Sequence, residues 1–192
     1  MGEAGEKASR KPRADSLRNR ERLLDAARQV FSAGGPEASL EAVARAAELG
    51  IGTLYRHFPT REALFQAVYA REVDELANLA RDLAGGPDSG EALKTWLRAA
   101  LRMIATKKGM AAALRPAVDT CAPFYTDTAA RMRQAAEALV RPGALRGELR
   151  DDVTGEDIVT VLISLSYGTA RPDWQGATGR MLDIFVDGLR RG

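Results

Sequence analysis

Apolar residues recur every three or four positions along most of this 192-residue chain, which is the spacing of amphipathic helices. The first such stretch covers about residues 16–33 and is ended by Gly34-Gly35-Pro36. Two short helices follow over residues 40–47 and 51–57, and a longer helix covers residues 61–83. The pattern therefore predicts three helices close together in the first sixty residues, followed by a long fourth helix.

After Gly85-Gly86-Pro87, which we take as the domain boundary, the helical spacing continues almost to the end of the chain. Further helices are predicted over residues 88–109, 110–119, 123–143, 158–170 and 177–190. Pro116 bends or ends the second of these, and Pro142-Gly143 stops the third. The sequence has no credible run of strands and no apolar run near twenty residues. It therefore predicts an all-α fold of about nine helices with no membrane-spanning segment.

Polar residues able to cap a helix stand just before several of these stretches. Their side-chain oxygens can accept hydrogen bonds from the free backbone N–H groups of the first helical turn. The candidates are Ser39, Thr60, Asp88 or Ser89, and Asp152 or Thr154.

The composition is ordinary for a globular protein, with 45% apolar and 28% charged residues. The N-terminus is charged and lacks the apolar segment of a secretory signal, and the single cysteine, Cys121, cannot form an internal disulfide. We therefore expect a cytoplasmic protein. Cys121 is expected to be a small buried or half-buried residue, with a redox-sensing thiol as the alternative.

Positive charge is concentrated near the N-terminus, although the net charge of the chain is only +2. Residues 1–61 contain eleven Lys and Arg against eight Asp and Glu, which is +3, and residues 62–192 contain seventeen against eighteen, which is −1. Residues 1–14 are polar, contain Pro12 and show no periodicity, so we predict a disordered basic arm. Such an arm can follow a phosphate backbone or can simply be a solvated tail, and charge alone leaves both open.

The segment "GIGTLYRHF", residues 50–58, lies where two short helices meet after a longer packing helix, which is the arrangement of a helix-turn-helix. In that geometry the second short helix enters the major groove of DNA. Small residues such as Gly50 and Gly52 allow the backbone to come close to the duplex, while Leu54 and Phe58 point inward.

The polar side chains of the same segment suit phosphate binding. Tyr55, Arg56 and His57 carry a phenol, a guanidinium and an imidazole, all of which can donate hydrogen bonds to phosphate oxygens. Arg61, at the start of the next helix, can bind a further phosphate.

Other chemistry at this segment is disfavoured. His57 is the only histidine, and neither Glu48 nor Glu62 has the spacing of a catalytic partner or a metal ligand, so we expect no enzyme activity, no metal and no cofactor. The pair Gly50-x-Gly52 is not a dinucleotide fingerprint, because no strand precedes it and the third glycine is missing.

The run "LDAARQVFSAGGPEASLEAVARAAELGIGTLYRHFPTREALFQAV" closely resembles the N-terminal domain of the TetR family of transcriptional regulators. The similarity covers about residues 18–72 and includes an alanine-rich first helix, the "G-T-L-Y-x-H-F" motif and a following "R-E-x-L". The remaining 120 residues agree in helix number and apolar character only, although "ATKKGMAAAL" followed by "RPAVD" resembles a ligand-domain subgroup common in actinobacterial members.

The resemblance implies a set of residues that contact DNA bases or phosphates. By position these are Ser39, Gly52, Thr53, Tyr55, Arg56, His57 and Arg61. Two departures from the family pattern stand out: the usual "A-G-V" turn reads Glu48-Leu49-Gly50, and Ile51 occupies a position that is polar or basic in many members. Ile51 can contact a thymine methyl group or simply pack, and both roles stay open.

The resemblance also implies a small-molecule pocket and a dimer interface in the C-terminal region. The pocket candidates, for each of which ordinary core packing is the alternative, are Trp96, Met103, Met110, Leu114, Arg115, Val118, Thr120, Phe124, Tyr125, Met132 and Tyr167. The last two helices have more apolar surface than one small domain needs, and in the family they pair across a two-fold axis as a four-helix bundle. The interface candidates are Ile158, Leu162, Leu165, Met181, Leu182, Phe185, Val186 and Leu189.

The sequence thus predicts a basic arm (residues 1–14), a helix-turn-helix domain (15–60), a connecting helix (61–84) and a ligand-binding and dimerisation domain (85–192). The expected function is that of a homodimeric regulator, most often a repressor, that binds a palindromic double-stranded DNA operator and is released by a small molecule. The alternative is a protein of the same fold that binds small molecules without repressing, or an activator.

Overall fold

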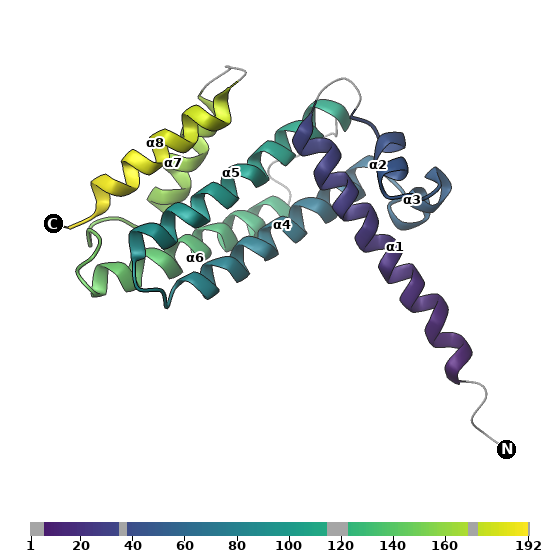
Figure 1. Ribbon diagram of the computed structural model, residues 1–192, viewed down its shortest axis with the longest axis horizontal. Helices are drawn as coiled ribbons and strands as arrows, with labels where there is room; N and C mark the ends of the chain where they lie inside the picture. The colour runs from purple at the N-terminus through teal and green to yellow at the C-terminus, as the bar shows by residue number, and fades with distance from the viewer. Residues whose placement is uncertain (1–5, 35–37, 115–122, 169–172, 192) are drawn as a thin grey trace. The chain divides into compact units, whose positions relative to one another are not determined.

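The computed structural model describes residues 6–34, 38–114, 123–168 and 173–191. These residues form eight helices and, apart from one isolated bridge between Leu149 and Arg190, no strand pairing (Figure 1). The predicted all-α fold is therefore confirmed. The helices are α1 (Glu6–Ala33), α2 (Leu40–Ala46), α3 (Ile51–His57), α4 (Arg61–Leu83), α5 (Ser89–Leu114), α6 (Pro123–Leu145), α7 (Gly155–Tyr167) and α8 (Trp174–Leu189).

The described contacts divide the chain into two compact units. The first contains residues 1–68 and 106–118, and the second contains residues 69–105 and 119–192. The sequence predicts a boundary at residue 85 instead. The structure assigns the start of α4 and the end of α5 to the first unit because their apolar side chains, such as Phe65 and Met110, are buried there.

The helix starts of the first unit are capped as predicted. The Ser39 hydroxyl accepts a hydrogen bond from the Ala42 backbone N–H at 3.1 Å, and the Thr60 hydroxyl accepts one from Ala63 at 3.0 Å. The core between the helices is formed by Leu23, Leu24, Ala27, Phe31, Leu40, Val43, Leu54, Phe58, Leu64 and Phe65. Capping and burial together hold the short helices α2 and α3, which are too short to be stable alone.

The turn between α2 and α3 has one unusual backbone conformation. Glu48 has a φ of +52°, in the left-handed region that residues with a Cβ atom seldom adopt. Its carboxylate forms an ion pair with Arg22 of α1 at 2.9 Å. The turn is thus made without glycine at its left-handed position.

The end of α5 crosses α1 at very short range within the first unit. A Cβ atom placed on Gly109 would lie 1.8 Å from the carbonyl oxygen of Phe31. Only glycine fits this crossing without displacing one of the two helices.

The second unit is built around α5, α6, α7 and α8. The Trp96 side chain is fully buried and its indole N–H donates to the Leu76 carbonyl at 3.0 Å. At the start of α7, Thr154 and Asp157 form a capping box, and the backbone N–H of Gly155 donates to Glu137 of α6 at 2.7 Å. These contacts confirm the Thr154 cap and fix α7 on α6.

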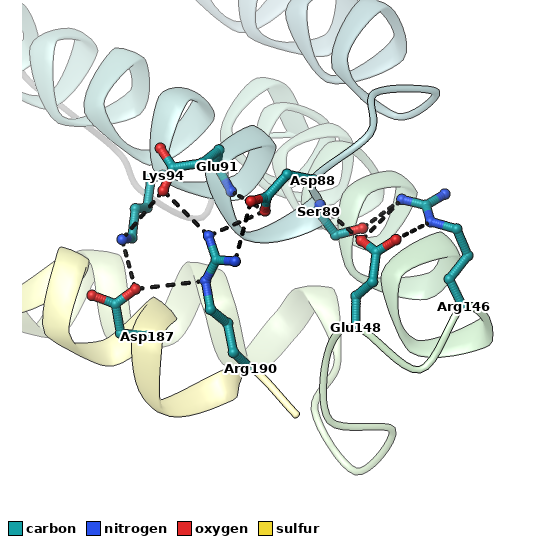
Figure 2. A network of polar contacts seen from close by, with 8 residues as sticks. All are labelled: Asp88, Ser89, Glu91, Lys94, Arg146, Glu148, Asp187 and Arg190. Carbon is teal, nitrogen blue, oxygen red and sulfur yellow. Dashed lines mark hydrogen bonds and ion pairs between the residues drawn. The ribbon is translucent and has the colours of Figure 1, made fainter. Parts of the chain in front are cut away.

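A network of charged residues joins the start of α5 to the end of α8 (Figure 2). Arg190 contacts Asp88 at 3.1 Å and Glu91 at 3.2 Å, and Lys94 contacts Asp187 at 2.6 Å. Asp88 also caps α5, because its carboxylate accepts the Glu91 backbone N–H at 2.9 Å.

The same figure shows a second part of the network, centred on Glu148. Glu148 accepts hydrogen bonds from the Ser89 backbone N–H at 2.9 Å and from Arg146 at 2.7 Å. These bonds hold the pKa of Glu148 at about 2, well below its usual value of 4.5. The backbone of this loop also pairs with the chain end, since Arg150 N–H donates to Leu189 at 2.8 Å.

Several helix boundaries differ from the predicted ones, including those of α1, α5 and α6. Helix α1 begins at Glu6, so the prediction of a disordered arm over residues 1–14 is wrong for residues 6–14, which continue the first helix. Their Glu, Lys, Arg and Ala residues favour helix, and the packed part of α1 provides the nucleus on which they extend. Helix α5 continues without a break to Leu114, which merges two of the predicted helices, and α6 continues through Pro142 to Leu145.

Candidate nucleic-acid interface

Helix α3 is a two-turn helix held on the core by its two large apolar residues. Leu54 is 1% exposed and Phe58, which ends the helix, is 2% exposed. Their spacing of four residues places them on one side of the helix. The rest of α3 is consequently left for contacts outside the unit.

The outward side of α3 presents the predicted DNA-contacting residues. Tyr55 is 44% exposed, Gly52 and Arg56 are also exposed, and Thr53 and His57 are half-buried. The Arg56 guanidinium donates to the Thr53 hydroxyl at 2.9 Å, which fixes its direction along the helix. These residues bring a phenol, a guanidinium and a hydroxyl together on one small surface.

Ile51 lies at the start of the same surface and is 38% exposed. It therefore does not belong to the core, although sequence alone left packing and base contact equally open.

The two glycines of the segment are not required by the interior of the protein. A Cβ atom at Gly50 or Gly52 would have no heavy atom within 4 Å, and neither residue has a positive φ. The fold would accept a larger residue at both positions. Their small size is therefore not required by packing within the unit.

Ser39 and Arg61 lie at the starts of the helices on either side of α3. The Ser39 hydroxyl is occupied as an acceptor in capping α2, but its hydrogen can still be donated. Arg61 is the first residue of α4 and is exposed.

Two arginines of α1 contact residues at the two ends of α3, and neither was predicted as a site residue from the sequence. The guanidinium carbon of Arg20 lies 5.3 Å from the centre of the Phe58 ring, a cation–π geometry. Arg22 binds Glu48 in the turn before α3. Sequence spacing could not identify them, because each acts on a residue 26 to 38 positions away.

The predicted ligand-pocket residues are divided between the two units. Trp96, Met103 and Met132 are buried in the second unit, whereas Met110 belongs to the first unit. The side chain of Leu114, and Arg115, Val118 and Thr120, lie outside the described residues, as does Cys121.

Aromatic residues of the second unit do form a cluster. The rings of Phe124 and Tyr125 lie 5.1 Å apart, and both lie about 6 Å from the ring of Tyr69 on α4. Burial raises the pKa of Tyr69, with smaller contributions from Tyr167 and the buried Glu72, against a hydrogen bond with Thr128. The sequence did not identify three members of this cluster, Tyr69, Glu72 and Thr128, as pocket candidates. The spacing of apolar and polar residues around them is that of an ordinary core helix.

An open pocket of about 630 Å³ lies elsewhere in the second unit, between α6 and the start of α7. Its lining includes Arg133, Glu137, Arg141 and Thr154, and none of the predicted ligand residues. In the part of the chain that the structure describes, no group of three or more His, Cys, Asp or Glu residues could hold a metal ion.

The dimer candidates on α7 and α8 divide into buried and exposed residues. Five of them pack inside the unit, namely Ile158, Leu162, Leu182, Val186 and Leu189. Leu165 and Phe185 are half-buried, and Met181 is 53% exposed. The large exposed apolar residues of these helices also include Ile163, at 48%, and Ile184, at 72%.

Two family models match the chain. The model described as bacterial regulatory proteins, tetR family, matches residues 23–68, which cover the helix-turn-helix. The model of the C-terminal domain of SbtR-like transcriptional regulators matches residues 88–191, more than half of the chain. The chain belongs to the TetR family of bacterial transcriptional regulators.

Solved structures of other TetR proteins extend this similarity over nearly the full chain. A TetR regulator from Streptomyces coelicolor is 40% identical, with 89% of this chain and 98% of that protein covered and a TM-score of 0.75. A TetR protein from Mycobacterium vanbaalenii is 32% identical, with coverages of 93% and 99% and a TM-score of 0.71.

Curated TetR relatives match only around the helix-turn-helix. The regulator UidR of Escherichia coli K12 is 43% identical over 54 residues, which is 28% of either chain. The repressor KstR of Rhodococcus jostii is 39% identical over 67 residues, 34% of this chain and 32% of that protein. The match thus spans about a third or less of these relatives' length.

Among the helices that the structure describes, none combines the length and the apolar character that a membrane-spanning segment needs.

Proposed function

We propose that this TetR protein represses transcription by binding a palindromic DNA operator as a homodimer, and that a small molecule bound by its second unit releases it. The observation that carries the proposal is the surface of α3. Leu54 and Phe58 anchor the helix from behind, while Tyr55 and Arg56 are exposed beside two glycines that the fold does not need.

DNA recognition by α3 combines contacts of two kinds. Tyr55, Arg56 and His57 donate to phosphate oxygens and fix the position of the helix in the major groove, while Gly52 allows its backbone to come close. Ile51 is exposed and reads a thymine methyl group. Ser39, Thr53 and Arg61 add hydrogen bonds at the edge of this surface.

Dimerisation supplies a second copy of α3, which reads the second half-site of the operator. The exposed apolar residues Ile163, Met181 and Ile184 on α7 and α8 form a surface suited to an identical partner, together with the half-exposed Phe185. Two copies of α3 then read two halves of a palindrome, which gives a short helix the specificity it lacks alone.

Release by a ligand requires a path from the second unit to the first. Helices α4 and α5 each run from one unit into the other, so a ligand that prefers one conformation of the second unit changes the position of the DNA-reading helices. Repression is supported by the named repressor KstR among the relatives. DNA as the target implies action in the cytoplasm of a bacterial cell.

The proposal is tested by electrophoretic mobility shift with duplexes from upstream of the protein's own gene and from a random-sequence library, at two salt concentrations. We expect a footprint with two-fold symmetry and steep salt dependence. Arg56→Ala is expected to lower affinity by roughly tenfold or more, since hydrogen bonds to charged groups contribute about 1.5–3 kcal/mol.

Arg180→Ala serves as the matched control, because Arg180 is an exposed arginine of α8 in the second unit. It is expected to leave affinity unchanged. Failure of the wild-type protein to bind any duplex at low salt would overturn the proposal.

A further inference from the structure

The open pocket of the second unit lies between two rows of α6 residues and the start of α7. On α6 the lining residues occupy positions 133, 137 and 141 in one row and positions 134, 138 and 142 in the next. On α7 the lining consists of the cap residue Thr154 and of Glu156. The volume of about 630 Å³ is in the range of small-molecule sites.

The two arginines of the first row, Arg133 and Arg141, are not bound to any other side chain in the part of the chain that the structure describes. Other arginines of the second unit, such as Arg98, Arg131 and Arg190, are held by carboxylates. Arg133 is half-buried and Arg141 is exposed. Two guanidinium groups in one pocket can therefore bind an anion from solution.

Glu137 is the residue expected to pair with these arginines, because it lies four positions from each of them. Its carboxylate instead accepts the backbone N–H of Gly155 at 2.7 Å. A Cβ atom on Gly155 would lie 2.5 Å from the carbonyl oxygen of Arg133, so the start of α7 comes very close to α6. This close approach holds Glu137 at α7 and leaves Arg133 and Arg141 without a carboxylate partner.

The second row of α6 gives the pocket an apolar floor. Arg133 and Arg141 are eight residues apart in one helix, which separates their Cα atoms by about 12 Å. Ala138 lies between them along the helix, and Pro142 lies beside Arg141. A molecule that reaches both arginines therefore passes over apolar side chains.

Two carboxylates of the lining restrict the kind of anion that fits. Glu137 comes from α6 and Glu156 from α7, and both are exposed. A compact polyanion such as phosphate brings all of its charge close to these carboxylates and is repelled. An elongated dianion with an apolar middle places its charges at the two arginines and avoids most of this repulsion.

We propose that this pocket binds a small organic dianion, whose two carboxylates are held by Arg133 and Arg141 and whose apolar middle lies over Ala138. Guanidinium groups bind carboxylates through paired hydrogen bonds, so each end of the ligand is fixed. The inference goes beyond the proposed function and does not depend on DNA binding.

The test is isothermal titration calorimetry on the full-length protein without DNA, at low ionic strength. The probe is octanedioate, which has a carboxylate at each end of an alkyl chain. Octanoate has only one carboxylate, and the two carboxylates of propanedioate are too close together to reach both arginines. Octanedioate is expected to bind more tightly than either by roughly tenfold or more, because each of the others loses one charged pair.

Single substitutions test the two ends of the site. Arg133→Gln and Arg141→Gln are each expected to weaken octanedioate binding by roughly tenfold and to remove its advantage over octanoate. Glu156→Gln is expected to strengthen binding by about two- to threefold, because it removes a repelling charge.

Arg180→Gln is the matched control, since Arg180 is an exposed arginine of the same unit that does not line the pocket. It should bind octanedioate as the wild type does. Denaturant unfolding followed by circular dichroism should give wild-type midpoints for Arg133→Gln and Arg141→Gln, because neither arginine holds another side chain.

The inference would be overturned by equal affinity for the three ligands, or by no binding of octanedioate at millimolar concentration. Wild-type affinity in either arginine variant, equal weakening in Arg180→Gln, or tighter binding of inorganic phosphate would also contradict it. The mobility shift of Arg56→Ala is measured without these ligands, so the proposed function is tested separately.

Discussion

Glu48 and Gly52 are four residues apart, and each departs from what its own backbone and surroundings favour. Glu48 carries a side chain where the left-handed φ favours glycine, whereas Gly52 lacks one where the helix and the open space would accept it. The first departure costs stability, and packing within the unit does not require the second. Both can be tested by single substitutions.

Gly52→Ala is expected to separate folding from DNA binding. Alanine in place of a helical glycine raises the free energy of unfolding by up to about 1 kcal/mol, because nothing lies near the new Cβ atom. The same methyl group stands between α3 and the duplex, so we expect affinity for DNA to fall by roughly tenfold. Thermal unfolding and mobility shift measure the two effects, and lower thermal stability in the variant would contradict the account.

Glu48→Gly is expected to stabilise the first unit. It relieves a left-handed conformation that costs about 1 kcal/mol for a residue with a Cβ atom, and it removes an exposed ion pair with Arg22 worth only about 0.5 kcal/mol. Glu48→Ala is the control, since it removes the ion pair but keeps the strain. Denaturant unfolding should rank the glycine variant above wild type and the alanine variant below it; a glycine variant less stable than wild type would show that the ion pair outweighs the backbone strain.

At the scale of elements, the exact length of each helix depends on contacts that a linear pattern does not contain. The capped starts of α2, α4 and α7 follow from Ser39, Thr60 and Thr154, because a cap is a local interaction. The continuation of α6 through Pro142 does not follow from local sequence. Tertiary packing of this part of α6, including Leu139 and Val140, favours the helix over the break that proline alone would cause.

Gly109→Ala is expected to destabilise the first unit strongly. The new Cβ atom would lie 1.8 Å from the Phe31 carbonyl oxygen, so α5 and α1 must move apart, at a cost of about 1–3 kcal/mol. Gly188→Ala in α8 is the matched control, because no heavy atom lies within 4 Å of its Cβ position, and it should be neutral or stabilising. Circular dichroism at increasing denaturant gives both values; equal behaviour of the two variants would show that the helices do not cross so closely.

At the scale of the whole molecule, stability depends on charges that join distant parts of the chain. Glu148 connects the loop before α7 to the start of α5, and Arg190 connects α5 to the chain end. These groups lie 59 to 102 positions apart in the sequence. Ionic contacts between distant segments therefore stabilise the second unit together with its apolar core.

Low pH is expected to remove the contribution of Glu148 to the free energy of unfolding. Its pKa is lowered from 4.5 to about 2, chiefly by Arg146 and then by Ser89, so the stabilisation is complete above pH 4.5 and disappears as the pH falls toward 2. Glu148→Gln should therefore be less stable than wild type at pH 7, and the difference should shrink between pH 5 and pH 2. Fluorescence of Trp96 and Trp174, both in the second unit, follows the transition.

Asp82→Asn, which removes an exposed carboxylate from α4 in the second unit, is the control and should change stability little. A difference between Glu148→Gln and wild type that stays constant down to pH 2 would show that the lowered pKa does not contribute to stability.

The sequence by itself determined the all-α fold, the helix-turn-helix and its family. Periodic apolar positions, caps and the "GTLYRHF" motif are local, and each can be recognised without knowing what lies opposite. It also determined the inward direction of Leu54 and Phe58, because four-residue spacing sets one side of a helix.

Only the tertiary structure decided the rest. It showed that five of the eight residues proposed for the dimer interface are buried within the protomer, that Met110 belongs to the first unit, and that Tyr69 joins Phe124 and Tyr125. A single amphipathic helix cannot indicate which of its apolar residues face its own core and which face a partner. That choice depends on the positions of neighbouring helices, and so does the contact that places Arg20 of α1 over Phe58.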